Sequence, residues 1–228
     1  VLFSFPIASI MLMRDATAGT LRPVHPWWVA ARTAAAVIGT MSAFYAFTVL
    51  PLAEVYAILF ASPLLITLLA IPILGEKVRL QRGLAVITGL AGIMVVLQPG
   101  QADLTPGHLA ALTAAICGAF ASVVVRRIGA EERSVVLLLY PLVANFVIMG
   151  AAIPFVYQPM PVQDLGRVAL TALLAFAAMN CMIYAYRHAE AALVAPMQYS
   201  QILWALLFGA LLFDETPSSR TLVGAAMV

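Results

Sequence analysis

The sequence predicts an all-α membrane protein: a ten-transmembrane-helix bundle of two inverted five-helix repeats, here lacking the first helix and part of the last. Three observations lead to this prediction. The composition is 64% hydrophobic and 10% charged, whereas soluble domains are about half apolar and a quarter charged. Several apolar segments are about 20 residues long, enough to cross a hydrocarbon core of about 30 Å. The two halves of the chain also resemble each other.

The internal repeat becomes visible when the chain is shifted by 139 positions against itself. Tyr45-Ala46-Phe47 then aligns with Tyr184-Ala185-Tyr186, and Leu74-Gly75-Glu76 aligns with Phe213-Asp214-Glu215. In both copies a long apolar helix ends in an acidic turn, and a basic residue and a second helix follow. An odd number of helices in each copy would turn the two halves upside down relative to each other, which is a recurrent design of membrane transporters.

Nine apolar segments follow one another along the chain. In order they span residues 1–13, 28–48, 52–74, 80–98, 107–126, 134–156, 167–187, 191–213 and 218–228. The first and last are too short to cross a bilayer, and the repeat assigns each to a longer helix that continues beyond this chain. We therefore expect the natural reading frame to extend at both ends. The predicted domains are a first repeat over residues 1–98, truncated at its N-terminal end, and a second over residues 105–228, truncated at its C-terminal end.

Turn signals and prolines punctuate these segments. Trp27 and Trp28 place an aromatic anchor at the start of 28–48. Pro63 lies inside 52–74, where it removes the backbone hydrogen bond to Leu59 and predicts a kink beside a cavity. Pro196 is early in its segment, where it is expected merely to start the helix. Turns separate other segments at Gln98-Pro99-Gly100, Thr105-Pro106-Gly107, Gln158-Pro159 and Glu215-Thr216-Pro217.

The basic residues favour one membrane orientation. Ten of the twelve lie in one set of alternate loops, and only Arg167 and Arg220 lie in the other. Because cytoplasmic loops carry an excess of Lys and Arg, the loops near residues 14–27, 75–82, 126–133 and 187–190 are predicted to face the cytoplasm. Both termini of the full chain would then be cytoplasmic, and the expected location is a bacterial inner (plasma) membrane.

The chemistry of an enzyme is not visible in the sequence. The three histidines have no metal-ligand spacing, no HExxH is present and no glycine-rich loop suits a phosphate. We therefore predict no catalytic residues, no metal, no cofactor and no nucleic acid partner. Cys117 and Cys181 lie in apolar segments and are interpreted as packing residues. The expected partners are a small-molecule substrate and the lipid bilayer, and the sequence assigns no oligomeric state.

Polar and aromatic groups near the centres of the segments supply a candidate substrate site. Gln198 and Gln201 are three residues apart and share one helical face, and the repeat aligns Ser62 with Gln201. If the two halves face each other across a pseudo-twofold axis, such pairs converge on the membrane midplane. The candidate substrate-binding residues are Gln198, Tyr199, Gln201, Trp204, Ser62, Phe60, Tyr56, Asn180 and Tyr184.

Each of these groups has an alternative interpretation, in which it joins helices or packs as a core aromatic residue. For Asn145, another amide near the centre of its segment, that alternative is preferred. Arg32 and Arg187, near cytoplasmic ends, are expected to extend their charged heads towards water rather than to bind. The acids are interpreted as solvated loop residues, Glu132 among them, although Glu54 at an outer helix end is also placed to meet an entering cation.

The chain resembles the drug/metabolite transporter superfamily, EamA type, over nearly its whole length. The resemblance is carried by Tyr45-Ala46, Leu50-Pro51-Leu52-Ala53, Ser62-Pro63-Leu64, Leu74-Gly75-Glu76-Lys77 and Gly89 to Gly92, and in the second copy by Tyr184-Ala185-Tyr186, Ala191 to Pro196 and Phe213-Asp214-Glu215-Thr216. It implies a ten-helix transporter with inverted five-helix repeats and a central cavity. Members move amino acids, vitamins such as riboflavin, S-adenosylmethionine and similar metabolites. No substrate residue is carried over from the family.

The expected function is therefore transport of a small organic metabolite across the inner membrane by alternating access through a central cavity. Two alternatives remain at this point. A membrane-embedded enzyme would need clustered His and acidic residues at one interface, and these are missing. A structural or receptor-like membrane subunit without transport would have no need of inverted halves.

The charge distribution makes a testable prediction of topology. Cysteines introduced at Gln101 and Gln163 should react with a membrane-impermeant thiol reagent in intact cells, whereas cysteines at Gln81 and Ala130 should not. The opposite labelling pattern would reverse the orientation. Labelling at all four positions would refute the assignment of the segments.

Overall fold

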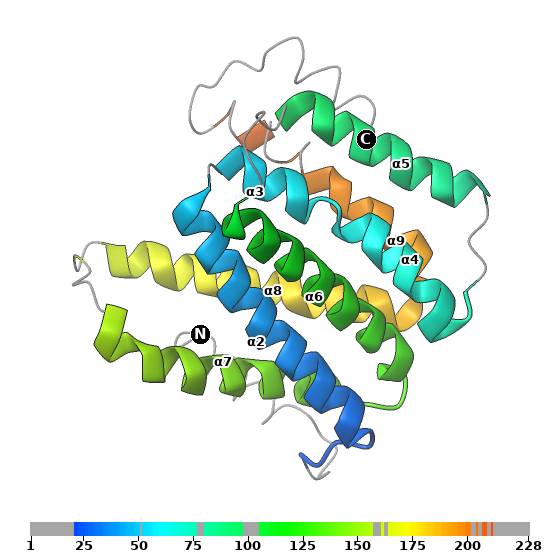
Figure 1. The fold of residues 1–228 in the computed structure, drawn as a ribbon. Helices are drawn as coiled ribbons and strands as arrows, with labels where there is room; N and C mark the ends of the chain where they lie inside the picture. Colours follow the sequence, from blue (N-terminus) through cyan, green and yellow to red (C-terminus); the bar gives the residue numbers. More distant parts are fainter. Residues whose placement is uncertain are drawn as a thin grey trace. The chain divides into compact units, whose positions relative to one another are not determined.

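A computed structural model of the chain describes residues 21–50, 52–76, 80–97, 105–156, 161, 164–201, 204, 207–208 and 211. The described residues are helical, without strands. The elements are α2 (Pro26–Val49), α3 (Leu52–Leu59), α4 (Ser62–Leu74), α5 (Leu80–Leu97), α6 (Pro106–Ile128), α7 (Ser134–Val156), α8 (Leu165–His188), α9 (Ala191–Met197) and the 3₁₀ turn η2 (Gln198–Ser200) (Figure 1).

Most of the helix boundaries agree with the sequence prediction. The bounds of α2, α5, α6, α7 and α8 match the corresponding predicted segments to within two residues at each end. Helices α2, α6, α7 and α8 are each long and apolar enough to cross a membrane. The short segments 1–13 and 218–228 and the acidic turn Asp214-Glu215 lie outside the described residues, so the ten-helix inverted repeat stays a prediction.

One predicted helix, 52–74, is two helices in the structure. Helix α3 ends at Leu59, Phe60 and Ala61 form a turn, and α4 begins at Ser62 with Pro63 in its first turn. The amide of Ala61 donates to the carbonyl of Ile58 three residues back, at 3.0 Å. Because Pro63 has no N–H group, it cannot continue the α-helical ladder across this turn. The expected kink is therefore a break.

The segment that begins at 191 is interrupted as well. Helix α9 ends at Met197, and the 3₁₀ turn η2 follows. Pro196 lies in the last turn of α9, so the expectation that it only starts the helix is wrong. Shifting Gln198–Ser200 back by 139 residues gives 59–61, the position of the break between α3 and α4. The two interruptions are therefore separated by the offset of the predicted repeat.

By their contacts the residues group into two compact units. Unit 1 comprises Val1–Val37 and Val124–His188, and unit 2 comprises Ile38–Val123 and Ala189–Val228. Each unit therefore contains residues from both predicted repeats. In unit 2, α4 packs along α9, and α5 packs against both of them (Figure 1). The candidate residues of segments 52–74 and 191–213 belong to this unit.

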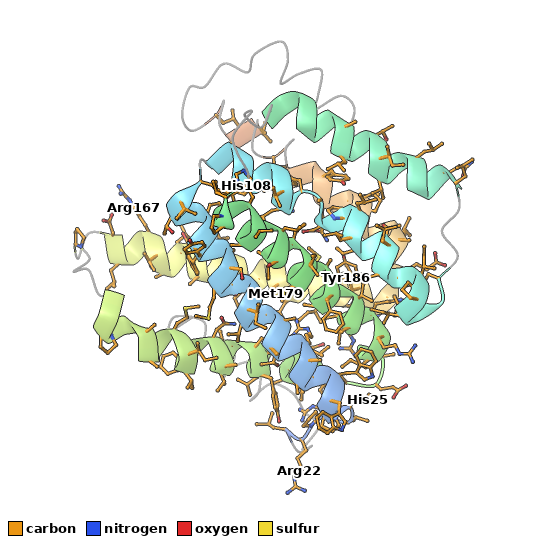
Figure 2. All side chains as sticks on the ribbon, viewed as in Figure 1. Arg22, His25, His108, Arg167, Met179 and Tyr186 are labelled. Atoms are coloured by element: carbon orange, nitrogen blue, oxygen red, sulfur yellow. The ribbon has the colours of Figure 1, made fainter. Side chains whose placement is uncertain are left out.

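In unit 1, polar contacts join three loops that the charge distribution assigned to one membrane face. Figure 2 shows His25 and Arg22 at the N-terminal end of α2. The His25 ring contacts the Glu131 carboxylate at 2.6 Å, and the His25 backbone N–H donates to Glu132 at 2.5 Å. Arg126 donates to the carbonyl of Arg187 at 3.2 Å. The residue before α2 therefore meets the loop after α6, and the ends of α6 and α8 meet each other.

Three of the charged residues do not behave as the sequence suggested. Arg32 is buried, and its guanidinium donates to the carbonyl of Leu137 instead of reaching water. Arg187 is half-buried and donates to the Ser134 hydroxyl. Glu132 is also buried, with 2% of its surface exposed, so it is not a solvated loop residue. In each case a polar group from another segment replaces the water that was expected.

The neighbouring acids Glu131 and Glu132 provide a matched test of this arrangement. Replacing Glu132 with Ala leaves the His25 N–H, at the start of α2, without its carboxylate acceptor and should destabilise the protein by about 1–3 kcal/mol. The same change at Glu131, whose side chain is 67% exposed, should have a much smaller effect. Thermal unfolding in detergent measures both. Equal losses of stability would contradict the structural role of Glu132.

Candidate functional site

The two helix breaks of unit 2 are the starting point for a site, because the regular α-helical hydrogen-bond pattern is interrupted there. Lipid offers no hydrogen bonds, so non-helical backbone at membrane depth occurs only where protein or a water-filled cavity surrounds it. The first turn of α4, next to the first break, carries an additional side-chain hydrogen bond. The Thr67 hydroxyl, which is buried, donates to the carbonyl of Pro63 at 2.9 Å. Three of the nine predicted site residues, Phe60, Gln198 and Tyr199, lie in the breaks, and Ser62 and Gln201 directly follow them.

Tyr199 is the best-enclosed member of the candidate site. It lies in η2 and is 1% exposed. Its ring packs directly on the backbone of Gly89 in α5, where a Cβ would lie 2.6 Å from Cε2 and closer still to Cδ2. The hydroxyl of Tyr199 is buried and has no hydrogen-bond partner among the described residues. A buried hydroxyl without a partner is costly.

The first copy of the repeat contributes a small aromatic cluster. Tyr56 contacts Phe60 with ring centroids 6.2 Å apart, and its other neighbour Phe47 lies at 5.6 Å in an edge-on arrangement. Such offset and edge-to-face pairs are favourable geometries for aromatic rings. Tyr56 is nevertheless 46% exposed, and Ser62, at the start of α4, is half-buried. These residues therefore keep part of their surface accessible next to the break.

Gln198 and Gln201 keep the relation that the sequence predicted. Gln198 begins η2, and the backbone N–H of Gln201 donates to the carbonyl of Gln198. In a 3₁₀ turn, residues three apart align with each other, so the two amides stay on one side of the segment. Gln198 is half-buried and Gln201 is exposed. Trp204 is also exposed and stacks on Phe208 at 6.2 Å.

Asn180 and Tyr184 belong to unit 1 and find partners within their own helix. The amide of Asn180 donates to the carbonyl of Phe176 at 2.9 Å, and the exposed ring of Tyr184 stacks on His188 at 4.1 Å. The amide of Asn145 makes the same kind of contact, with Pro141 at 2.9 Å. These local contacts give each side chain a structural role. They support the packing interpretation of Asn145, and the binding role of Asn180 and Tyr184 stays a prediction.

Two residues near this site had not been singled out as candidates. Gly89 matters because Tyr199 needs a neighbour without a side chain. Glu76 matters because its carboxylate accepts backbone N–H groups of Ala191 and Ala192, at the start of α9. The recurrence of the acidic turn in both copies was the available signal for Glu76. In the part of the chain that the structure describes, no three His, Cys, Asp or Glu side chains are grouped as a metal site.

Comparison with known proteins decides the family. The EamA-like transporter family matches residues 105–228, which is more than half of the chain and coincides with the predicted second repeat. The chain belongs to the EamA-like transporter family. A solved crystal structure that is 23% identical superposes with a TM-score of 0.83, over 99% of this chain and 82% of the other, so the fold occurs among solved structures.

Several curated bacterial transporters are similar to this EamA-like chain. An S-adenosylmethionine uptake transporter of Rickettsia bellii is 25% identical, over 99% of this chain and 79% of its own length. A riboflavin transporter of Rhizobium johnstonii is 26% identical over 99% and 75%. Another riboflavin transporter, from Vibrio cholerae, is 29% identical over 92% and 71%. The protein is thus a multi-pass membrane transporter of the small-metabolite kind and not an enzyme.

The contact between Gly89 and Tyr199 makes a second prediction about stability. Gly89→Ala should destabilise the protein by about 1–3 kcal/mol, because the new Cβ overlaps the tyrosine ring. Gly83→Ala on the same helix is the matched control, since nothing lies within 4 Å of a Cβ there. That control should be neutral or slightly stabilising. Thermal unfolding of both variants is the measurement, and a Gly89→Ala protein as stable as Gly83→Ala would show that the ring does not pack there.

Proposed function

We propose that this protein moves a small organic metabolite across a bacterial inner membrane by alternating access, using a site at the two helix breaks of unit 2. The observation that carries the proposal is the coincidence of the breaks. Residues 59–61 and 198–200 occupy the same position in the two copies of the repeat, and both are followed by further helical residues. The proposal includes two inverted repeats, over residues 1–98 and 105–228, with both termini of the full chain in the cytoplasm.

Discontinuous helices suit a transport site for a physical reason. Their interrupted backbones present N–H and C=O groups to a solute near the middle of the membrane, where no lipid group could do so. They are also the points at which a helix can bend between two states. In this chain the breaks carry Phe60 in the first copy, and Gln198 and Tyr199 in the second. Amides, a phenol and aromatic rings are therefore the side-chain groups proposed to bind the solute.

The chemistry of these groups favours a neutral, zwitterionic or aromatic solute. The proposed solute-binding residues of unit 2 are uncharged: Gln198, Tyr199, Gln201, Trp204, Ser62, Phe60 and Tyr56. The binding role predicted for Asn180 and Tyr184, in unit 1, is separate from this site and also involves uncharged groups. Flat heteroaromatic compounds fit such a set, because rings stack on aromatic side chains while amides pair with ring nitrogens and carbonyls. The names of the relatives point the same way, since riboflavin and S-adenosylmethionine both contain a heteroaromatic ring system. These two compounds are the first solutes to test.

Transport by the full-length protein in proteoliposomes tests the proposal. Labelled riboflavin or S-adenosylmethionine should enter vesicles that contain the protein faster than vesicles without it. Gln201→Ala and Tyr199→Phe should each reduce that rate about tenfold, equivalent to about 1.4 kcal/mol of lost solute interaction. Tyr199→Phe is preferred to Tyr199→Ala because it keeps the ring on Gly89 and removes only the unpaired hydroxyl. This variant should unfold at the same temperature as the parent or higher.

The control is Asp164→Asn, which changes an exposed residue paired with Arg167 at 3.1 Å at the start of α8, where Figure 2 labels Arg167. It should transport normally. If Gln201→Ala and Tyr199→Phe both fold and transport like the parent, the two residues pack helices and do not bind solute. If neither solute nor any wider panel of metabolites is transported by the parent protein, the proposed function itself is wrong.

A further inference from the structure

Helix α4 ends in a turn that fixes the position of Glu76. Gly75 has a left-handed backbone, with φ of 71°, which glycine adopts without steric cost. Its N–H donates to the carbonyl of Ile71 at 3.0 Å, and the N–H of Glu76 reaches back to Ala70 at 3.4 Å. These two bonds close the helix end. The residue after Gly75 is therefore held by the backbone and not by a flexible loop.

The carboxylate of Glu76 binds the start of another helix. Its Oε1 accepts the N–H of Ala191 at 3.0 Å, and its Oε2 accepts the N–H of Ala192 at 3.2 Å. Glu190, the residue that precedes α9, makes no side-chain cap of its own. The first N–H groups of a helix lack partners within it. Glu76 thus caps α9 from 115 residues away in the sequence, and both helices belong to unit 2.

Two properties make this contact strong but reversible. An ionised carboxylate forms short, charge-assisted hydrogen bonds with N–H groups, and the positive end of the helix dipole adds to them. Both partners are backbone groups, so the contact depends on a single side chain. A glutamine cannot replace it, because its amide offers one oxygen, and its NH₂ group would face a second donor.

The contact is also close to the candidate site along both helices. Helix α9 has seven residues, and η2 with Gln198 and Tyr199 follows directly. Helix α4 has thirteen residues and begins at Ser62, beside the first break. The two helices pack along each other over this length. A separation of their ends at Glu76 would therefore be transmitted over short, stiff segments to the two breaks.

We propose that Glu76 is a latch that holds the ends of α4 and α9 together when the transport path is closed on the predicted cytoplasmic face. Opening the path on that face breaks the two hydrogen bonds from Glu76 to α9. This proposal rests on the proposed function, since it assigns the contact to one state of an alternating-access cycle. It also explains why an acid from one repeat pairs with the backbone of the other.

Thiol accessibility in the full-length protein tests the latch without any solute. Cys117 and Cys181 are first replaced with Ala. A reporter cysteine then replaces Ala195, which is fully buried in α9 between the two residues that Glu76 binds and η2. Unsealed membranes that contain this variant are treated with an impermeant maleimide. Glu76→Gln should accelerate labelling of Ala195→Cys about tenfold, because the closed state loses its charge-assisted bonds.

Two controls separate a latch from general loosening. Glu131→Gln is the same substitution at an exposed acid, and should leave the labelling rate of Ala195→Cys unchanged. A second reporter at Ala111, which is equally buried in a cluster with Ala46 and Val55 in unit 2, should label at the same slow rate with either glutamate or glutamine at position 76. Acceleration at Ala195→Cys alone supports the latch.

Three results would overturn it. Unchanged labelling at Ala195→Cys in a folded Glu76→Gln protein would make Glu76 a permanent cap. Equal acceleration at both reporters would mean general destabilisation. If Glu76→Gln does not fold, Glu76→Asp takes its place, because aspartate keeps the charge but is too short to reach both N–H groups. Unchanged labelling of Ala195→Cys in that variant would also make Glu76 a permanent cap. Failure of the proposed function is separate, since it appears as absent transport in the parent protein.

Discussion

The structure depends on one constraint, the need of every backbone N–H and C=O group for a partner in a solvent that offers none. Long helices meet most of this need within themselves; α2, α6 and α8 are of this kind, whereas α7 contains Pro141 and Pro154, which lack N–H groups. The exceptions are the turn at Phe60 and Ala61 and the 3₁₀ turn Gln198–Ser200. Such interruptions are costly in lipid, and the two lie at the offset of the predicted repeat. This coincidence is the basis of the proposed solute site.

The same constraint explains what the charged residues do. Their partners are chiefly backbone groups at or near helix ends rather than opposite charges. Glu132 accepts the His25 N–H before α2, Arg32 donates to the Leu137 carbonyl in the first turn of α7, and Glu76 accepts two N–H groups of α9. Each contact spans more than 100 residues of sequence. The charged side chains thus act as connectors between distant helix ends, where a single substitution removes the whole contact.

Much of the fold could be predicted from the sequence because it depends on local patterns. Apolar length and turn residues located five helices to within two residues. The repeat offset paired Ser62 with Gln201, but it predicted no interruption at Gln198–Ser200. Features that depend on distant neighbours could not be predicted. From the sequence alone, Arg32 is expected to reach water, because its acceptor Leu137 is 105 residues away. Glu132 is likewise expected to be a solvated loop acid, because its donor, the His25 N–H, is 107 residues away. The burial of Tyr199 likewise depends on Gly89, 110 positions earlier in another helix. Pro63 signalled an interruption, but whether a proline kinks or ends a helix is decided by the packing around it.

The central claim is that the two breaks are the paired working parts of one solute site, and hydrogen exchange of the full-length protein in lipid nanodiscs tests it most directly. Without solute, backbone amides of 59–62 and 198–201 should exchange faster than those in the middle of α6, because cavity water reaches them. Saturating riboflavin or S-adenosylmethionine, whichever is transported, should slow exchange in both segments together. Two results would contradict the account. In the first, the amides of 59–62 and 198–201 exchange as slowly as those of α6 and do not respond to a transported solute. In the second, the solute protects only one of the two segments.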